Sequence, residues 1–165
     1  MLALDIAKNL GYAIDYSNNE LVVGTINGDP IFQLRCIYNF IPAVEEIVIE
    51  QLNAFNSPNP KTLTVLAQRV GYLTYSLQEN YNVIFKTPAQ WRSYLNIKNN
   101  KTGSKELQSQ IEKTANIYLN IDETDALGLW LCTKQLQVDD LSKYTLVKAK
   151  KLNAPSNKKR NQKSR

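Results

Sequence analysis

The stretch LALDIAKNLGYAIDYSNNELVVGTI, residues 2–26, decides the fold. It contains three short apolar runs of the length and composition that form strands: Leu2–Ile6, Gly11–Tyr16 and Leu21–Ile26. Turn-forming residues 17–19 (Ser-Asn-Asn) separate the last two runs. The spacing predicts three consecutive antiparallel strands at the start of the chain. The first of them carries an aspartate, Asp5, among apolar neighbours.

Beyond this stretch, helical and strand patterns alternate along the chain. Five segments repeat apolar residues at helical spacing: 31–41, 63–77, 91–95, 107–118 and 126–131. Two further apolar runs, Ile47–Ile49 and Val83–Phe85, are short enough to be strands covered on both faces. The polar segment Lys98–Ser104 predicts a loop. Together these elements predict an α/β fold, a mixed five-stranded sheet flanked by helices.

Length and composition indicate one globular domain. With 165 residues, 43% of them apolar, the chain can bury one core, which we assign to residues 1–148, followed by a basic, disordered tail at 149–165. No apolar run reaches the roughly 18 residues that span a bilayer, and the N-terminus lacks a secretory signal pattern. We therefore expect a soluble protein without a membrane partner, in the cytoplasm or nucleoid of the host cell. Cys36 and Cys132 lie in apolar patterns and are expected as reduced core thiols.

The chain contains no histidine. This excludes Ser-His and Cys-His nucleophiles, histidine-ligated zinc and histidine acid-base chemistry. An enzyme with this composition has to use carboxylates or lysines. Carboxylate ligands favour hard cations, so the composition points to magnesium or manganese.

Positive charge is unevenly distributed, although the net charge is +5. Residues 148–165 hold eight Lys or Arg and no acid, so the preceding 147 residues carry a net charge of −3. Within that body, residues 61–105 contain seven basic side chains and one acid, Glu79. This local excess can neutralise phosphates.

Two acids lie on predicted strands. Asp5 interrupts an apolar strand, where a carboxylate is costly unless it is paired or binds a cation. Glu50 stands at the end of an apolar strand, where α/β folds present functional groups. For Asp5 a strand-end hydrogen bond to a turn is an equally good explanation. Glu45 and Glu46, before the second of these strands, fit solvated entry positions.

Two more acids, Asp122 and Asp125, lie one turn apart at a predicted helix start and can reach one ion. By themselves they fit helix capping better than metal binding. Glu123 is expected on another face, in solvent. As a set with Asp5 and Glu50, however, they match two-metal phosphoryl chemistry, in which a carboxylate bridges two ions roughly 3.5–4 Å apart.

The contexts of these acids resemble the motifs of RuvC-type Holliday junction resolvases, in the RNase H-like superfamily. Asp5 followed by Gly-Tyr-Ala-Ile at 11–14 resembles their first catalytic motif, and Ile-Glu-Gln-Leu at 49–52 resembles the second. The stretch Asp-Glu-Thr-Asp-Ala-Leu-Gly-Leu at 122–129 is similar to the last. The resemblance spans most of residues 1–135, with order and spacing preserved.

The resemblance implies a homodimer that binds a four-way DNA junction and makes paired, symmetric nicks. Asp5, Glu50, Asp122 and Asp125 would be the catalytic residues and the ligands of Mg²⁺ or Mn²⁺, two ions per active site. In the family, a basic segment between the second and third motifs contacts DNA. Lys98, Lys101 and Lys105 occupy that segment here, although charge runs of this kind also occur as solvated loops.

The sequence departs from the family pattern in two places. The family commonly has glycines around the first aspartate, where this chain has Ala3 and Ala7, which suggests a diverged phage, viral or organellar-type branch. The family also places an aromatic residue shortly after the Glu motif to open the junction centre, and the nearest candidate here, Phe55, is offset or simply a core residue.

Two other functions fit the same residues. One is a broader nuclease of the same fold, acting on flaps, replication forks or RNA-DNA hybrids. The other is a non-catalytic nucleic-acid-binding protein whose acids are helix caps and strand-end turns. The basic residues 158–160 fit either a phosphate-binding arm or a solubilising end.

Overall fold

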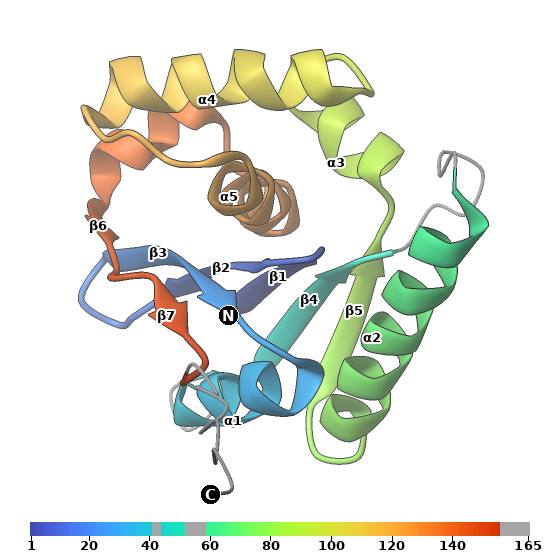
Figure 1. Cartoon of the computed structure of the whole chain (residues 1–165). Coiled ribbons are helices and arrows are strands. Elements are labelled where there is room, and N and C mark those ends of the chain that lie inside the picture. Colours follow the sequence, from blue (N-terminus) through green and yellow to red (C-terminus); the bar gives the residue numbers. More distant parts are fainter. Residues whose placement is uncertain (41–43, 52–58, 156–165) are drawn as a thin grey trace, which may run out of the picture.

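The computed structural model describes residues 1–40, 44–51 and 59–155 of the chain. A sheet lies between two layers of helices (Figure 1). Its strands are β1 (Leu2–Ile6), β2 (Leu10–Asp15), β3 (Glu20–Asn27), β4 (Glu46–Glu50), β5 (Asn82–Lys86), β6 (Thr145–Lys148) and β7 (Leu152–Asn153). The helices are α1 (Pro30–Phe40), α2 (Pro60–Gln78), α3 (Pro88–Tyr94), α4 (Lys101–Ala115) and α5 (Ile121–Lys134), with a 3₁₀ helix η3 at Val138–Lys143.

The sheet has the order β5-β4-β1-β2-β3-β6, with β7 also paired to β3. Strands β1, β2 and β3 form the antiparallel meander that the opening stretch predicts. Strands β4 and β5 join parallel to β1 and to each other. The expectation of five strands was wrong, because β6 and β7 bring the sheet to seven strands within the described residues. These two strands have four and two residues, too short for a period-two pattern to reveal them.

The last strand lies within the segment assigned from the sequence to a tail beginning at residue 149. The backbone N–H of Ala149 donates to the carbonyl of Val23, and that of Ala154 donates to the carbonyl of Asn27. The sheet therefore continues past residue 148. Residues 156–165, which include the basic 158–160, lie outside the described part of the chain.

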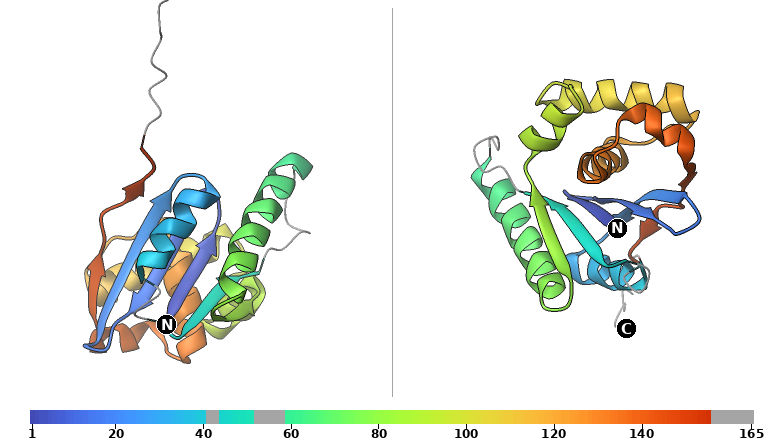
Figure 2. Two further views of the ribbon diagram at one scale, coloured as in Figure 1. Left: turned by 90° about the horizontal axis from the view of Figure 1, so that it is seen from below. Right: turned by 180° about the vertical axis from the view of Figure 1, so that it is seen from behind.

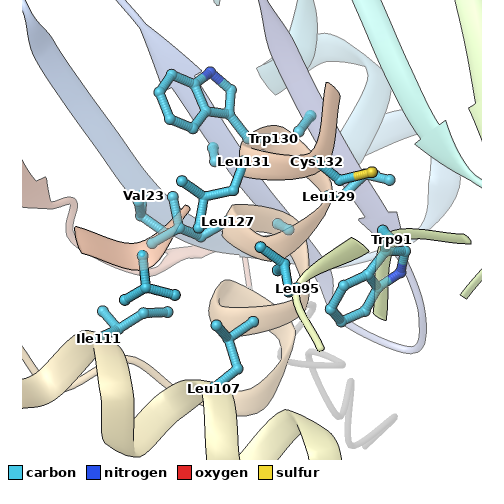
Figure 3. Close-up of a cluster of buried hydrophobic side chains, with 14 of the residues drawn as sticks. Val23, Trp91, Leu95, Leu107, Ile111, Leu127, Leu129, Trp130, Leu131 and Cys132 are labelled. Atoms are coloured by element: carbon cyan, nitrogen blue, oxygen red, sulfur yellow. The ribbon is translucent and has the colours of Figure 1, made fainter. Parts of the chain in front are cut away.

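Side chains of the strands alternate between two cores, one on each face of the sheet. In β1, Leu2 and Leu4 point to the core under α1 and α2, whereas Ala3 points to the core under α3, α4 and α5. Figure 2 shows α1 and α2 side by side over their face. The opposite core contains both tryptophans, Trp91 and Trp130 (Figure 3). The predicted arrangement of a mixed sheet flanked by helices is confirmed.

Helix α4 begins earlier than the sequence suggested. Residues 98–104 were expected to be a loop, but Asn100 caps the helix by accepting hydrogen bonds from the backbone N–H groups of Thr102 and Gly103. A Cβ at position 103 would lie 1.9 Å from the carbonyl oxygen of Lys98, so glycine allows the turn to close on itself. The loop is confined to the residues before Lys101.

Cys36 and Cys132 are free and buried, as predicted. Among the described residues, no helix combines the length and apolar character needed to cross a membrane.

Helix α5 packs over β1, β2 and β3 (Figure 1), and its N-terminal end comes close to β2. Gly11 is paired with Asp5 across the β1–β2 ladder. A Cβ at position 11 would lie 2.0 Å from the backbone oxygen of Asp122. The absence of a side chain at this position therefore lets the start of α5 rest against the strand that neighbours Asp5.

Replacing Gly11 with alanine should lower the free energy of unfolding by about 3 kcal/mol, because the added methyl meets backbone that no rotamer change can move. Urea denaturation measures the change. Gly71→Ala on α2 is the matched control, because a Cβ there meets nothing within 4 Å. The control should raise stability by about 1 kcal/mol through helix propensity. A Gly11→Ala variant as stable as the wild type would disprove the close approach.

Candidate active site

Adjacent parallel strands bring Asp5 and Glu50 to one face of the sheet. In the pairing of β1 with β4, Leu4 lies opposite Ile49, so the next residue of each strand is an acid. Since side chains alternate, Asp5 shares its face with Ala3, and Glu50 shares its face with Val48. Both of those neighbours belong to the core under α5. The two strand carboxylates therefore point toward α5.

Helix α5 supplies Asp122 and Asp125 without using either as its cap. Asn120 is the N-cap, and its side chain accepts a hydrogen bond from the backbone N–H of Glu123 at 2.9 Å. The carboxylate of Glu123 accepts from the backbone N–H of Asn120 at 2.8 Å. The capping explanation that the sequence favoured for the Asp pair was therefore wrong, because Asn120 and Glu123 form the capping box.

Glu123 was also misplaced by sequence reasoning, which put it in solvent. Only 2% of the residue is exposed. Its carboxylate accepts a hydrogen bond from the Thr25 hydroxyl at 3.0 Å and pairs with the Lys148 ammonium at 3.1 Å. A capping-box glutamate bends back toward the start of its helix. In this protein, that orientation brings the Glu123 carboxylate into contact with β3 and β6. Glu123 ties α5 to the sheet and is not part of the candidate site.

The buried carboxylates raise one another's pKa. Burial is the main reason that the pKa of Asp5 lies well above its ordinary value, and the negative charges of Glu50, Asp125 and Asp122 raise it further. Burial likewise raises the pKa of Glu50 to about 7, and the charge of Asp125 adds to the effect. Burial is also the main cause of the raised pKa of Asp125. The acids therefore lie within electrostatic reach of each other, and a bound cation would favour their ionised forms.

Three of the four carboxylates accept a hydrogen bond from a neutral or basic side chain of another element. The indole Nε1 of Trp91 donates to Oε2 of Glu50 at 2.7 Å. The guanidinium of Arg92 donates from Nη2 to Oδ2 of Asp125 at 3.1 Å. The amide of Asn9 donates from Nδ2 to Oδ2 of Asp122 at 3.1 Å. Each of these carboxylates is therefore already oriented by a partner from another element.

The donor set fits a hard divalent cation. All four candidate groups are carboxylates, and Oδ1 of Asp125 is buried with no hydrogen-bond partner among the described residues. In the described part of the chain, no group of three or more His, Cys, Asp or Glu side chains is arranged to hold a metal as it stands. Hydrogen bonds from Trp91, Arg92 and Asn9 already occupy one oxygen on each of three of these carboxylates.

The three predicted DNA-contacting lysines lie around the start of α4, and all three residues are exposed. Lys98 is paired with Glu106 at 3.0 Å, whereas Lys101 and Lys105 lie in the first two turns of the helix. Between them, the Ser104 hydroxyl accepts a hydrogen bond from Nη2 of Arg92 at 3.3 Å. The basic end of α4 is thus linked to the acidic site through Arg92.

The sequence pattern marked Trp91 only as an apolar residue of the helical segment 91–95 and did not single out Arg92 or Asn9. Arg92 was visible only as one of several basic residues between 61 and 105. Neither periodicity nor charge counting indicates which arginine turns inward, because that depends on how α3 packs against α5. Phe55, the candidate junction-opening aromatic, lies outside the described residues.

Comparison with known proteins places the fold. No protein-family model matches the sequence, and no curated protein matches it. Two solved structures of RuvC from Thermus thermophilus do match. The one in complex with its Holliday junction substrate has a TM-score of 0.58 and 12% identity, covering 80% of this chain and 92% of that chain. The second has a TM-score of 0.51, 13% identity and the same coverage of 80% and 92%. The chain has the RNase H-like fold of the RuvC resolvases that its motifs resemble.

Proposed function

We propose that the protein is a structure-selective DNA endonuclease, a Holliday junction resolvase that hydrolyses phosphodiester bonds to leave paired symmetric nicks. Two features support the proposal: Asp5 and Glu50 share the face of the sheet that α5 covers, and the charges of Glu50, Asp122 and Asp125 all act on the buried Asp5. The four acids come from two strands and a helix, and their order matches the resolvase motifs. The fold, shared with a RuvC bound to its junction substrate, supports the same assignment.

The four carboxylates would hold Mg²⁺ or Mn²⁺, two ions per site. When bound, such ions would activate a water for in-line attack and would neutralise charge on the leaving oxygen. The protein's own residues supply orientation. Trp91 fixes one oxygen of Glu50, and Asn9 fixes one oxygen of Asp122. Burial of Asp5, which is 9% exposed, keeps bulk water from screening the charges that act on the phosphate.

The two-fold symmetry of the proposed junction substrate implies that the protein acts as a homodimer. Paired symmetric cuts in a two-fold symmetric junction need two active sites related by the same symmetry. Helix α2 offers apolar surface for such contact, since Val65, Tyr72 and Tyr75 are 60%, 42% and 70% exposed. Sedimentation of the purified chain should give twice the monomer mass. A monomer at micromolar concentration that still makes paired cuts would contradict this arrangement.

Asp5→Asn should slow cleavage of a synthetic four-way junction in Mg²⁺ by about a thousandfold, the rate equivalent of roughly 4 kcal/mol of lost charge stabilisation. Binding of the junction should persist, because the amide is close in size to the carboxylate. Asp139→Asn is the control, since Asp139 is exposed on η3, which follows the C-terminal end of α5, whereas Asp122 and Asp125 lie at its N-terminal end. Wild-type cutting rates in Asp5→Asn would remove the catalytic assignment.

The same assay defines the substrate class. A mobile junction, a flap, a linear duplex and an RNA-DNA hybrid are digested side by side with the wild type. A resolvase cuts the junction fastest, in pairs at symmetry-related positions. Equal cutting of flaps or hybrids would instead identify a broader nuclease, and no cutting of any substrate would identify a binding protein.

Replacing both Lys101 and Lys105 with alanine should weaken junction binding and flatten its salt dependence. If each lysine contacts one phosphate, the slope of log K against log salt should fall in magnitude by about 0.9 for each lysine removed. Lys113→Ala is the control, because Lys113 lies about 12 Å further along the same helix. An unchanged slope would mean that the two lysines are merely solvated.

A further inference from the structure

One short helix, α3, controls two carboxylates of the site. Trp91 and Arg92 are adjacent in sequence, yet the first binds Glu50 on β4 and the second binds Asp125 on α5. The guanidinium of Arg92 lies 4.6 Å from the centre of the Trp91 ring. The two side chains therefore form one stacked unit that reaches both elements.

Packing fixes the position of this unit. Helix α3 starts with a capping box between Thr87 and Gln90, and Trp91 is fully buried. A Cβ at Gly128 of α5 would lie 2.7 Å from the Trp91 ring, so the indole rests directly on the helix that carries the site's aspartates. The packing of Trp91 against α5 therefore places the adjacent Arg92 next to Asp125.

The ion pair between Arg92 and Asp125 is imperfectly satisfied. Their side chains are 13% and 11% exposed, so both charges are largely removed from water. Nε of Arg92 and Oδ1 of Asp125 are buried without hydrogen-bond partners among the described residues. A buried pair gains stability only when its remaining donors and acceptors are also satisfied. The Arg92–Asp125 pair is therefore incompletely satisfied, and separating it costs less than separating a fully hydrogen-bonded pair.

We propose that Arg92 is a built-in counter-cation, which holds Asp125 while no divalent cation is present and must be displaced from it when one binds. Arg92 is then a positioning residue that sets how tightly the site takes up metal. The inference rests on the proposed metal site at the four carboxylates and adds a residue that those motifs do not contain. Charge supports it, since the guanidinium acts on Asp5, Glu50 and Asp125 together.

The test is Mn²⁺ binding to metal-free protein without DNA, measured by calorimetry. Arg92→Gln should bind Mn²⁺ about tenfold more tightly than the wild type, because an opposite charge beside a carboxylate changes its affinity for cations by about that factor or more. Arg92→Lys keeps the charge and should stay within about threefold of the wild type. Without metal, Arg92→Gln should melt at a lower temperature, and Mn²⁺ should restore more of its stability than it adds to the wild type.

Lys148→Gln is the matched control. Lys148 also pairs with a nearly buried carboxylate of α5, that of Glu123, which is not one of the four site acids. This variant should lose thermal stability equally with and without metal, and its Mn²⁺ affinity should equal that of the wild type. The control separates loss of a structural ion pair from loss of the counter-cation.

Each result decides between definite alternatives. Unchanged or weaker Mn²⁺ binding by Arg92→Gln, with wild-type binding intact, would overturn the inference and leave the proposed nuclease standing. No Mn²⁺ binding by any variant would overturn both. If Arg92→Gln does not fold, NMR of the wild type tests the same inference.

The Nε–H signal of Arg92, followed during Mg²⁺ titration, should shift and exchange faster as the ion pair with Asp125 opens. A signal that stays unchanged at saturating Mg²⁺ would refute the displacement.

Discussion

Repulsion among buried carboxylates is the constraint on which the rest of the molecule depends. Asp5, Glu50 and Asp125 lie in surroundings of low polarity, where like charges interact far more strongly than in water. Such a cluster would destabilise a fold unless something holds it. Here the sheet and α5 provide the framework, and the unit formed by Trp91 and Arg92 supplies a hydrogen bond and a positive charge.

Two glycines set the distances within this framework. Gly11 lets α5 rest on β2 beside Asp5, and Gly128 lets Trp91 rest on α5 beside Glu50. In both places a backbone or ring occupies the volume of a missing side chain. Protein interiors are packed too densely to absorb an extra methyl at such points. The position of the acids is therefore decided by close packing as much as by charge.

Much of the fold could be predicted from the sequence, because β1 to β5 and the five helices have clear apolar periods. The short β6 and β7 could not, since β6 has only four residues and β7 lies within the segment assigned to the basic tail at 149–165. The four site acids were found through their joint order. Their environment was not, because the cap at Asn120, the buried Glu123 and the inward Arg92 depend on contacts between distant elements.

The contact between Glu123 and Lys148 also concerns the order in which the protein is made. A nascent chain that has reached the end of α5 already carries all four acids of the site. It still lacks β6, and with it the ammonium that pairs with the buried Glu123 at the start of α5. Until that strand is made, α5 can pack against β1 to β4 and Glu123 can accept from Thr25, but the buried carboxylate has no counter-charge. A chain that stopped before β6 would therefore contain every acid of the candidate site but would hold α5 less firmly against the sheet, because the buried charge of Glu123 would lack its partner.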